Sequence, residues 1–159
     1  MEASRPATPD DVARVVELAK EQRAELAPTR GGALWLLHDT WAAPLDDAYR
    51  ALLGRDDASL VVGTIDDAVL GFGAVVVEDL RDGTRLGVIT DLFVEVPARE
   101  VGLGDAIAAD LIEFCRAQGC RGVDALALPG HRATKNFFEG HRFSARSLTM
   151  HRSLAGDER

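Results

Sequence analysis

The segment from Arg85 to Gly119 constrains the fold most strongly, because its hydrophobic period changes part-way along. Between Arg85 and Val96 two faces alternate, one with Leu86, Val88, Leu92, Val94 and Val96 and the other with Ile89, Asp91, Phe93 and Glu95. That period predicts a β-strand, which Pro97 ends. Gly102-Leu103-Gly104 then opens an amphipathic helix that runs to about Gly119. A strand, a short turn and a helix in direct succession predict an α/β domain.

The remaining elements follow from the same kind of pattern. Thr8-Pro9-Asp10-Asp11 is a typical helix start, and the helix is expected to end before Pro28. Further elements are expected as short helices at 34–37, 46–53 and 133–140 and as strands at 59–65, 68–78, 122–128 and 143–154. The order predicts one mixed α/β domain over residues 1–159, with a mostly antiparallel sheet flanked by helices.

Composition excludes several functions. No apolar run approaches the ~20 residues that span a bilayer, and residues 1–11 lack a signal-peptide core, so we expect a cytoplasmic protein without a membrane partner. The net charge of −8 argues against a nucleic-acid surface. Neither the two cysteines, Cys115 and Cys120, nor the four histidines have metal-ligand spacing, so no metal is expected.

The charge is unevenly distributed along the chain. Residues 121–159 carry seven Lys or Arg and four Asp or Glu, a net +3, so residues 1–120 carry −11. Asp-Asp pairs at 10–11, 46–47, 56–57 and 66–67 contribute to this difference. They are consistent with turns, caps and solubility, and also with an acidic surface that attracts a cationic amine.

The turn between the strand and the helix has the composition of an anion site. A helix start offers unpaired amides and a positive dipole end, which suit a pyrophosphate, and glycine allows close approach to the backbone. Arg99 adds a permanent positive charge. Glycines at 102 and 104 are equally compatible with a tight turn that needs them for packing. The chain has no P-loop sequence, and Ile107 stands where a dinucleotide-binding fingerprint needs its third glycine.

Two segments resemble the conserved blocks of the GNAT acetyltransferase superfamily. Arg99-x-x-Gly102-x-Gly104 resembles the signature Arg/Gln-x-x-Gly-x-Gly/Ala that binds the coenzyme A pyrophosphate. The segment from Pro129 to Phe143 resembles the second block, with Phe137-Phe138-Glu139 in place of Phe-Tyr-Glu. His131, Thr134 and Arg142 stand where Asn, Ala and Gly are common, and Phe138 replaces the Tyr that often protonates the departing thiolate.

The resemblance implies acetyl-CoA as acyl donor and direct attack of a neutral amine on the thioester. A β-bulge is expected to splay the fourth and fifth strands, and the backbone amide of Val94 is expected to polarise the thioester carbonyl. The residues implied in coenzyme A binding are Phe93, Val94, Arg99, Glu100, Val101, Gly102, Leu103, Gly104, Asp105, Asn136 and Phe138.

Asp91 is the candidate general base, because it lies beside Phe93 on one strand face. Glu78, at the end of the neighbouring expected strand, is the alternative base. A chain of water molecules is a further route for the proton. The alternative for Asp91 is a solvated or salt-bridged strand carboxylate, and Glu78 also fits a role outside the site.

The residues on the acceptor side leave several alternatives open. Trp35, Trp41 and Tyr49 fit a substrate pocket, core packing or a homodimer contact. The amine acceptor and the preferred acyl chain are not determined by the sequence. Because Phe138 replaces the usual Tyr, a second hypothesis is a domain that binds acyl-CoA as a sensor and has lost catalysis.

Overall fold

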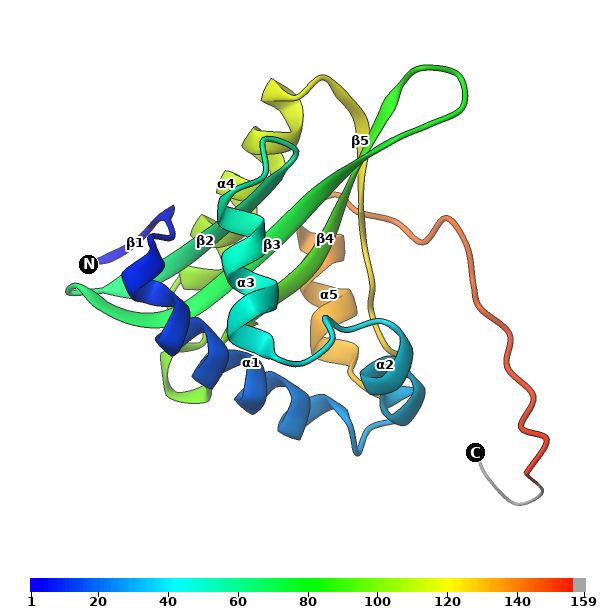
Figure 1. The fold of residues 1–159 in the computed structure, drawn as a ribbon. Coiled ribbons are helices and arrows are strands. Elements are labelled where there is room, and N and C mark those ends of the chain that lie inside the picture. The colour runs from blue at the N-terminus through cyan, green and yellow to red at the C-terminus, as the bar shows by residue number, and fades with distance from the viewer. Residues whose placement is uncertain (156–159) are drawn as a thin grey trace.

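A computed structural model describes residues 1–155 (Figure 1). Five strands are present in it: β1 (Glu2–Pro6), β2 (Ala58–Ile65), β3 (Ala68–Asp79), β4 (Arg85–Val94) and β5 (Cys120–Ala125). The α-helices are α1 (Val12–Leu26), α2 (Gly32–His38), α3 (Leu45–Leu53), α4 (Leu103–Ala117) and α5 (Arg132–Gly140). Short 3-10 turns occupy Pro9–Asp11 and Val96–Ala98. The mixed α/β class expected from the sequence is therefore confirmed.

The five strands form one sheet in the order β1-β2-β3-β4-β5. Neighbouring strands are antiparallel except β4 and β5, which are parallel because α4 connects them as a crossover. Strand β1 was missed by the hydrophobic pattern. It lies at the sheet edge and its five residues are exposed or half-buried, so they carry no alternation to detect.

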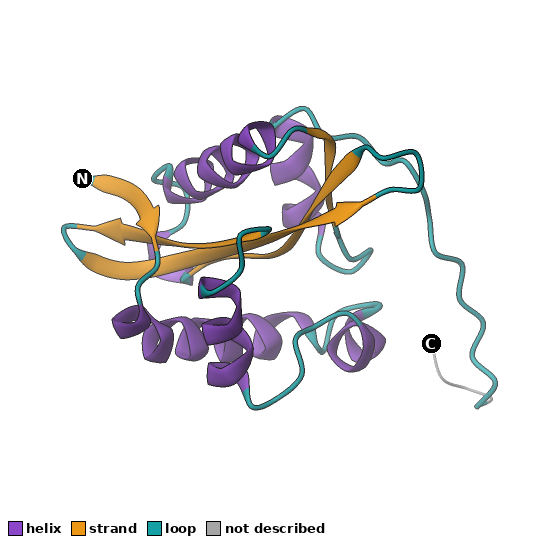
Figure 2. Cartoon of the chain, turned by 45° about the horizontal axis from the view of Figure 1, so that its top comes forward, coloured by secondary structure: helices purple, strands orange, loops and turns teal. Residues whose placement is uncertain are grey.

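Helices cover both faces of the sheet (Figure 2). On one face α1 and α3 enclose a core that includes Leu18, Tyr49 and Phe72. On the other face α4 and α5 enclose a second core that includes Ile107, Leu111 and Phe138. Tyr49 and Phe72 pack edge to face with ring centroids 5.7 Å apart. The sheet is therefore the middle of three layers, and its residues alternate between two cores.

A β-bulge in β4 corrects the strand faces expected from the sequence. Val75 pairs with Ile89 but Ala74 pairs with Asp91, so Thr90 is an extra residue in β4. The bulge shifts the alternation by one position. Val88 therefore packs with the α1–α3 core together with Phe93, while Ile89 joins Leu92 and Val94 on the α4 face. Asp91 and Phe93 do share a face, as expected.

The final strand expected at 143–154 is absent. Residues 144–155 form no helix or strand and pair with no strand, and Figure 1 shows this tail leaving the body of the molecule. Its alternating apolar side chains indicate a strand, but a strand needs a partner edge to satisfy its backbone.

Candidate functional site

Strands β4 and β5 separate immediately beside the bulge. Their parallel pairing runs from Arg85 and Cys120 to Ile89 and Ala125, and there it ends. Beyond this point β4 continues to Val94 while the chain after β5 turns towards α5, and the two ribbons diverge in Figure 1. We call β4 residues 90–94 and the facing loop 126–131 the splayed region. The β4 backbone here has β3 on one side and, within residues 1–155, no strand on the other.

The start of α4 lies at the end of this β4 segment. Gly102 is its N-cap with φ +88°, a left-handed conformation that favours glycine, and no side chain of the described residues forms a capping hydrogen bond. The first amides of α4 therefore lack intrahelical partners. At Gly104 a Cβ would lie 3.1 Å from Cε1 of Phe137 on α5, so glycine allows the close approach of these two helices. This geometry is therefore consistent with both interpretations of the two glycines, an anion site at the helix start and close packing of the turn.

The Arg99 side chain contacts residues of β4 and α1. Its Nε donates to the backbone carbonyl of Val94 at 2.8 Å, and Nη2 donates to Oε1 of Glu25 at 2.7 Å. The guanidinium also lies over the ring of Phe93, with Cζ 5.3 Å from the ring centroid. Arg99 therefore connects the end of β4 to α1.

Glu25 connects Arg99 to His131, the N-cap residue of α5. Its Oε2 lies 2.9 Å from Nε2 of His131, whose Nδ1 lies 2.6 Å from Oγ1 of Thr134. Partial burial acts to raise the pKa of Glu25, but the charges and hydrogen bonds of Arg99 and His131 outweigh it and lower the pKa. Sequence reasoning missed Glu25, since nothing in local spacing links a residue of the first helix to residues 74 and 106 positions away.

Asp91 is buried on the α1–α3 side of the bulge. Its Oδ2 accepts from Nε1 of Trp41 at 3.0 Å and Oγ1 of Thr90 at 3.1 Å, and its Oδ1 accepts from the Tyr49 hydroxyl at 3.2 Å. Burial raises the pKa of Asp91, while these three donors act to lower it and offset only part of the effect. A carboxylate with a raised pKa is better matched to proton transfer near neutral pH.

The three aromatic residues expected on the acceptor side lie in different elements, Trp35 in α2, Trp41 in the loop before α3 and Tyr49 in α3. Tyr49 is in the core, and burial raises its pKa, so its hydroxyl remains a donor to Asp91. The indole of Trp41 reaches Asp91 from the loop before α3, and its carbonyl accepts from Nη2 of Arg23 at 2.9 Å. Trp35 on α2 is also buried. Trp41 and Tyr49 thus connect α3 and the loop before it to Asp91.

The other expected site residues are dispersed. Glu78 is exposed on β3, four residues from the Asp91 partner Ala74, a distance of about 13 Å at the rise of a strand. Phe138 is buried beside Phe137 and Phe143, with ring centroids 5.3 and 5.1 Å away. Leu103 is buried beneath the turn, and the exposed or half-buried members of the set are Glu100, Val101, Asp105 and Asn136. Oδ1 of Asp105 lies 2.7 Å from Nε2 of His141.

Within residues 1–155 no group of three or more His, Cys, Asp or Glu residues is arranged to hold a metal ion. The same residues contain no helix with the length and apolar character to cross a membrane. Both cysteines are free thiols, and burial raises the pKa of Cys115 to about 12.

The fold and the signature turn can now be compared with known proteins. The model of the acetyltransferase (GNAT) family matches residues 15–143. The chain belongs to the GNAT family. This confirms the resemblance inferred from the Arg99 to Gly104 signature and the Pro129 to Phe143 block. Acetyl-CoA is the co-substrate of acetyltransferases of this family.

One relative of this GNAT chain matches part of its sequence. It is 36% identical over 110 residues to glucosamine 6-phosphate N-acetyltransferase 1 of Oryza sativa subsp. japonica, a match that covers 60% of this chain and 65% of the relative. The chain thus spans just under two thirds of that relative.

Two solved GNAT-like structures superpose over nearly the whole chain. Glucosamine-6-phosphate N-acetyltransferase from Arabidopsis thaliana has a TM-score of 0.70 and 21% identity, covering 97% of this chain and 99% of that one. An aminoglycoside acetyltransferase from an uncultured soil metagenomic sample, in complex with sisomicin, has a TM-score of 0.71 and 15% identity, covering 97% and 95%. At these identities the likeness concerns the fold.

Proposed function

We propose that this chain transfers an acetyl group from acetyl-CoA to a primary amine. The observation that carries the proposal is the splayed region next to the uncapped start of α4. An extended acyl-pantetheine arm needs an unpaired strand edge for its amides, and a pyrophosphate needs unpaired N–H groups. The chain offers both within one continuous segment, from Thr90 to Gly104.

The residues at the start of α4 fit a pyrophosphate. No side chain of residues 1–155 hydrogen-bonds to the cap, and Gly102 has no Cβ to cover the backbone. The Glu2 carboxylate lies beside this turn, with one oxygen 3.7 Å from the position that a Cβ of residue 102 would take. The positive end of the helix dipole adds a favourable charge. In this arrangement Glu100 to Asp105 bind the pyrophosphate through backbone amides, while Arg99 acts by holding the carbonyl of Val94 and the end of β4 in place.

The proposed reaction is a direct transfer. The amine nitrogen attacks the thioester carbonyl, the new C–N bond forms, the C–S bond breaks, and coenzyme A leaves as a thiolate that takes up a proton. The Val94 amide is the proposed donor to the carbonyl oxygen, where negative charge develops. Asp91 is the proposed acceptor of the amine proton, with Glu78 as the alternative, because Asp91 lies within the splayed region and has a raised pKa.

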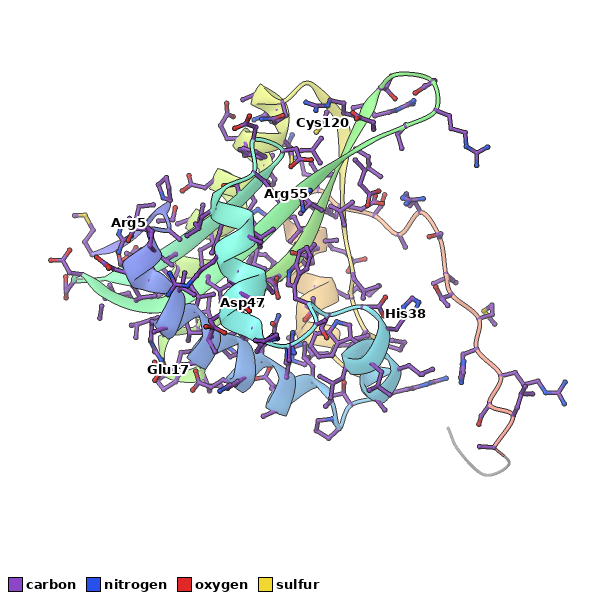
Figure 3. The ribbon with its side chains drawn as sticks, in the orientation of Figure 1. Arg5, Glu17, His38, Asp47, Arg55 and Cys120 are labelled. Carbon is purple, nitrogen blue, oxygen red and sulfur yellow. The ribbon has the colours of Figure 1, made fainter. Side chains whose placement is uncertain are left out.

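The proposed acceptor is a cationic amine. Residues 1–120 carry a net charge of −11. Within this acidic part of the chain, Glu17 of α1 and Asp47 of α3 lie on the two helices that cover one face of the sheet (Figure 3). A groove of about 630 Å³ in this layer is lined by residues that include Glu17, Asp46, Lys20 and Arg23. The acidic surface attracts cationic molecules over a long range, and the groove, which has both acidic and basic side chains, then discriminates among them.

An acceptor panel tests this proposal. We expect free thiol to be released from acetyl-CoA fastest with cationic amines such as polyamines and aminoglycosides, with a rate that falls as ionic strength rises. Glucosamine 6-phosphate belongs in the panel because the rice relative is named for it. If anionic amines are the best acceptors, the charge argument is wrong. Coenzyme A binding with no amine-dependent thiol release would instead favour the sensor hypothesis.

Phe138 provides a separate prediction about the leaving thiolate. A thiol with a reference pKa of about 8.5 lies only about 1.5 units above pH 7, so an unprotonated leaving group costs roughly 2 kcal/mol. We therefore expect Phe138→Leu to keep kcat within about tenfold and to lower the free energy of unfolding by about 1 kcal/mol through lost packing with Phe137 and Phe143. Phe138→Tyr is expected to raise kcat modestly. A loss of several orders of magnitude in Phe138→Leu, with normal folding and cofactor affinity, would contradict this account.

A further inference from the structure

Arg23 connects the last turn of α1 to the loop that carries Trp41. It is half-buried and lines the groove between α1 and α3. Its Nη2 donates to the backbone carbonyl of Trp41 at 2.9 Å, which fastens the loop before α3 to α1. Within residues 1–155 Arg23 has no salt-bridge partner, since the nearby α1 carboxylates Glu17 and Glu25 pair with Arg14 and Arg99. The positive charge of Arg23 is therefore not neutralised by a carboxylate of its own helix.

The loop that Arg23 holds supplies a hydrogen bond to the candidate base. The Trp41 indole donates from Nε1 to Oδ2 of Asp91 at 3.0 Å, and the Tyr49 hydroxyl donates to Oδ1 at 3.2 Å. Asp91 is only 7% exposed, so water is a poor substitute for a donor that moves away. By fixing the Trp41 backbone, Arg23 keeps the indole on Asp91.

The charge of Arg23 acts on the same carboxylate. Burial raises the pKa of Asp91, and the positive charge of Arg23 acts in the opposite direction. The titratable group that faces Asp91 from α3 is the Tyr49 phenol. On β3, Ala74 lies opposite Asp91, and Glu78 lies about 13 Å away along the strand. Arg23 is thus the cation that offsets part of the cost of ionising this buried carboxylate.

We propose that Arg23 is a positioning residue for the transfer reaction, because it holds the Trp41 indole on Asp91 and places a fixed positive charge beside the carboxylate. The inference rests on the proposed function, in which Asp91 accepts the amine proton and must be ionised to do so. Arg23 then increases the fraction of Asp91 that is ionised at a given pH. Because Arg23 also lines the groove proposed for the acceptor, one side chain belongs to both the acceptor groove and the surroundings of the base.

The titration of the Asp91 carboxyl group tests this inference without any turnover. In the full chain labelled with ¹³C at the aspartate carboxyl carbons, the Asp91 resonance is the one that disappears in Asp91→Asn. Arg23→Met removes the charge and keeps an apolar stem, and it should move the midpoint of the Asp91 titration up by about one pH unit. Arg23→Lys keeps the charge and should leave the midpoint close to that of the unsubstituted chain. Arg50→Met, which removes an exposed cation from α3, is the matched control and should have no effect.

The pH–rate profile is the second readout, measured with the best acceptor of the panel. In Arg23→Met the acidic limb should move up by the same amount, so the rate at a pH below the limb falls about tenfold and recovers as the pH rises. Arg23→Lys should restore the position of the limb. A purely structural role would instead lower the rate by the same factor at every pH.

The contrary outcomes are distinct. An unchanged Asp91 midpoint in Arg23→Met, or an equal rise in Arg23→Lys, would overturn the inference about Arg23. Arg23→Gln, a second neutral variant that retains an N–H donor, gives the same test if Arg23→Met disturbs the fold. A midpoint that rises in Arg23→Met while the acidic limb stays in place would contradict the proposed function, because Asp91 would then not be the base.

Discussion

Gly104→Asp is expected to weaken coenzyme A binding by at least about 100-fold, equivalent to about 2.7 kcal/mol. The substitution places a negative charge in the first turn of α4, where the pyrophosphate is proposed to bind, and opposes the anion directly. It also adds bulk at a position where even a Cβ would lie 3.1 Å from the Phe137 ring. Calorimetric titration with coenzyme A measures the effect.

Two control variants separate charge from packing. Gly104→Ala adds the crowded Cβ without the charge, and it should retain most of the affinity if the edge of the Phe137 ring moves slightly. Ala109→Asp adds the same charge to an exposed position further along α4 and should bind normally. Unchanged affinity in Gly104→Asp would show that the pyrophosphate is not bound at this helix start.

Asp91→Asn is expected to lower kcat by about 10²- to 10⁴-fold, the range that general-base catalysis supplies, with little change in the affinity for acetyl-CoA. The acidic limb of the pH–rate profile should disappear with the carboxylate. In the unsubstituted chain that limb should lie above the ordinary pKa range of an aspartate, because burial raises the pKa of Asp91 and the base acts only when ionised.

The fold should tolerate Asp91→Asn because the new amide satisfies the same neighbours. Its carbonyl can accept from the Trp41 indole, and its NH2 can donate to the Tyr49 hydroxyl, which accepts as well as donates. Glu78→Gln is the matched control, since Glu78 is exposed on β3 of the same sheet. A normal rate and pH profile in Asp91→Asn would move the proton-transfer role to Glu78 or to water, and a slow Glu78→Gln enzyme would identify Glu78.

Much of the fold could be predicted because local patterns and tertiary structure agree over long segments. The β4–α4 unit was predicted from its change of period, and α1, α3 and α5 lie close to the expected helices. The family resemblance followed from two blocks taken together, the signature from Arg99 to Gly104 and the segment from Pro129 to Phe143, because glycines 102 and 104 alone also fit a tight turn.

The differences arise where tertiary contacts outweigh local pattern. The bulge at Thr90 reversed the expected faces of Val88 and Ile89, because one extra residue shifts a period of two by half a cycle. Glu25 joins the site only through contacts with Arg99 and His131, which no local spacing could reveal. The expected last strand has the correct alternation, but within the described residues no strand pairs with it.

The central claim, that acetyl-CoA lies along β4 with its pyrophosphate at the start of α4, is tested most directly by a crystal structure of the chain with coenzyme A. We expect the pyrophosphate oxygens within hydrogen-bonding distance, about 2.7–3.2 Å, of backbone amides between residues 100 and 106. We also expect the pantetheine arm beside residues 90–94, on the side that β5 has left open. Coenzyme A bound instead in the groove between α1 and α3, or bound with its pyrophosphate away from Gly102 and Gly104, would contradict the account.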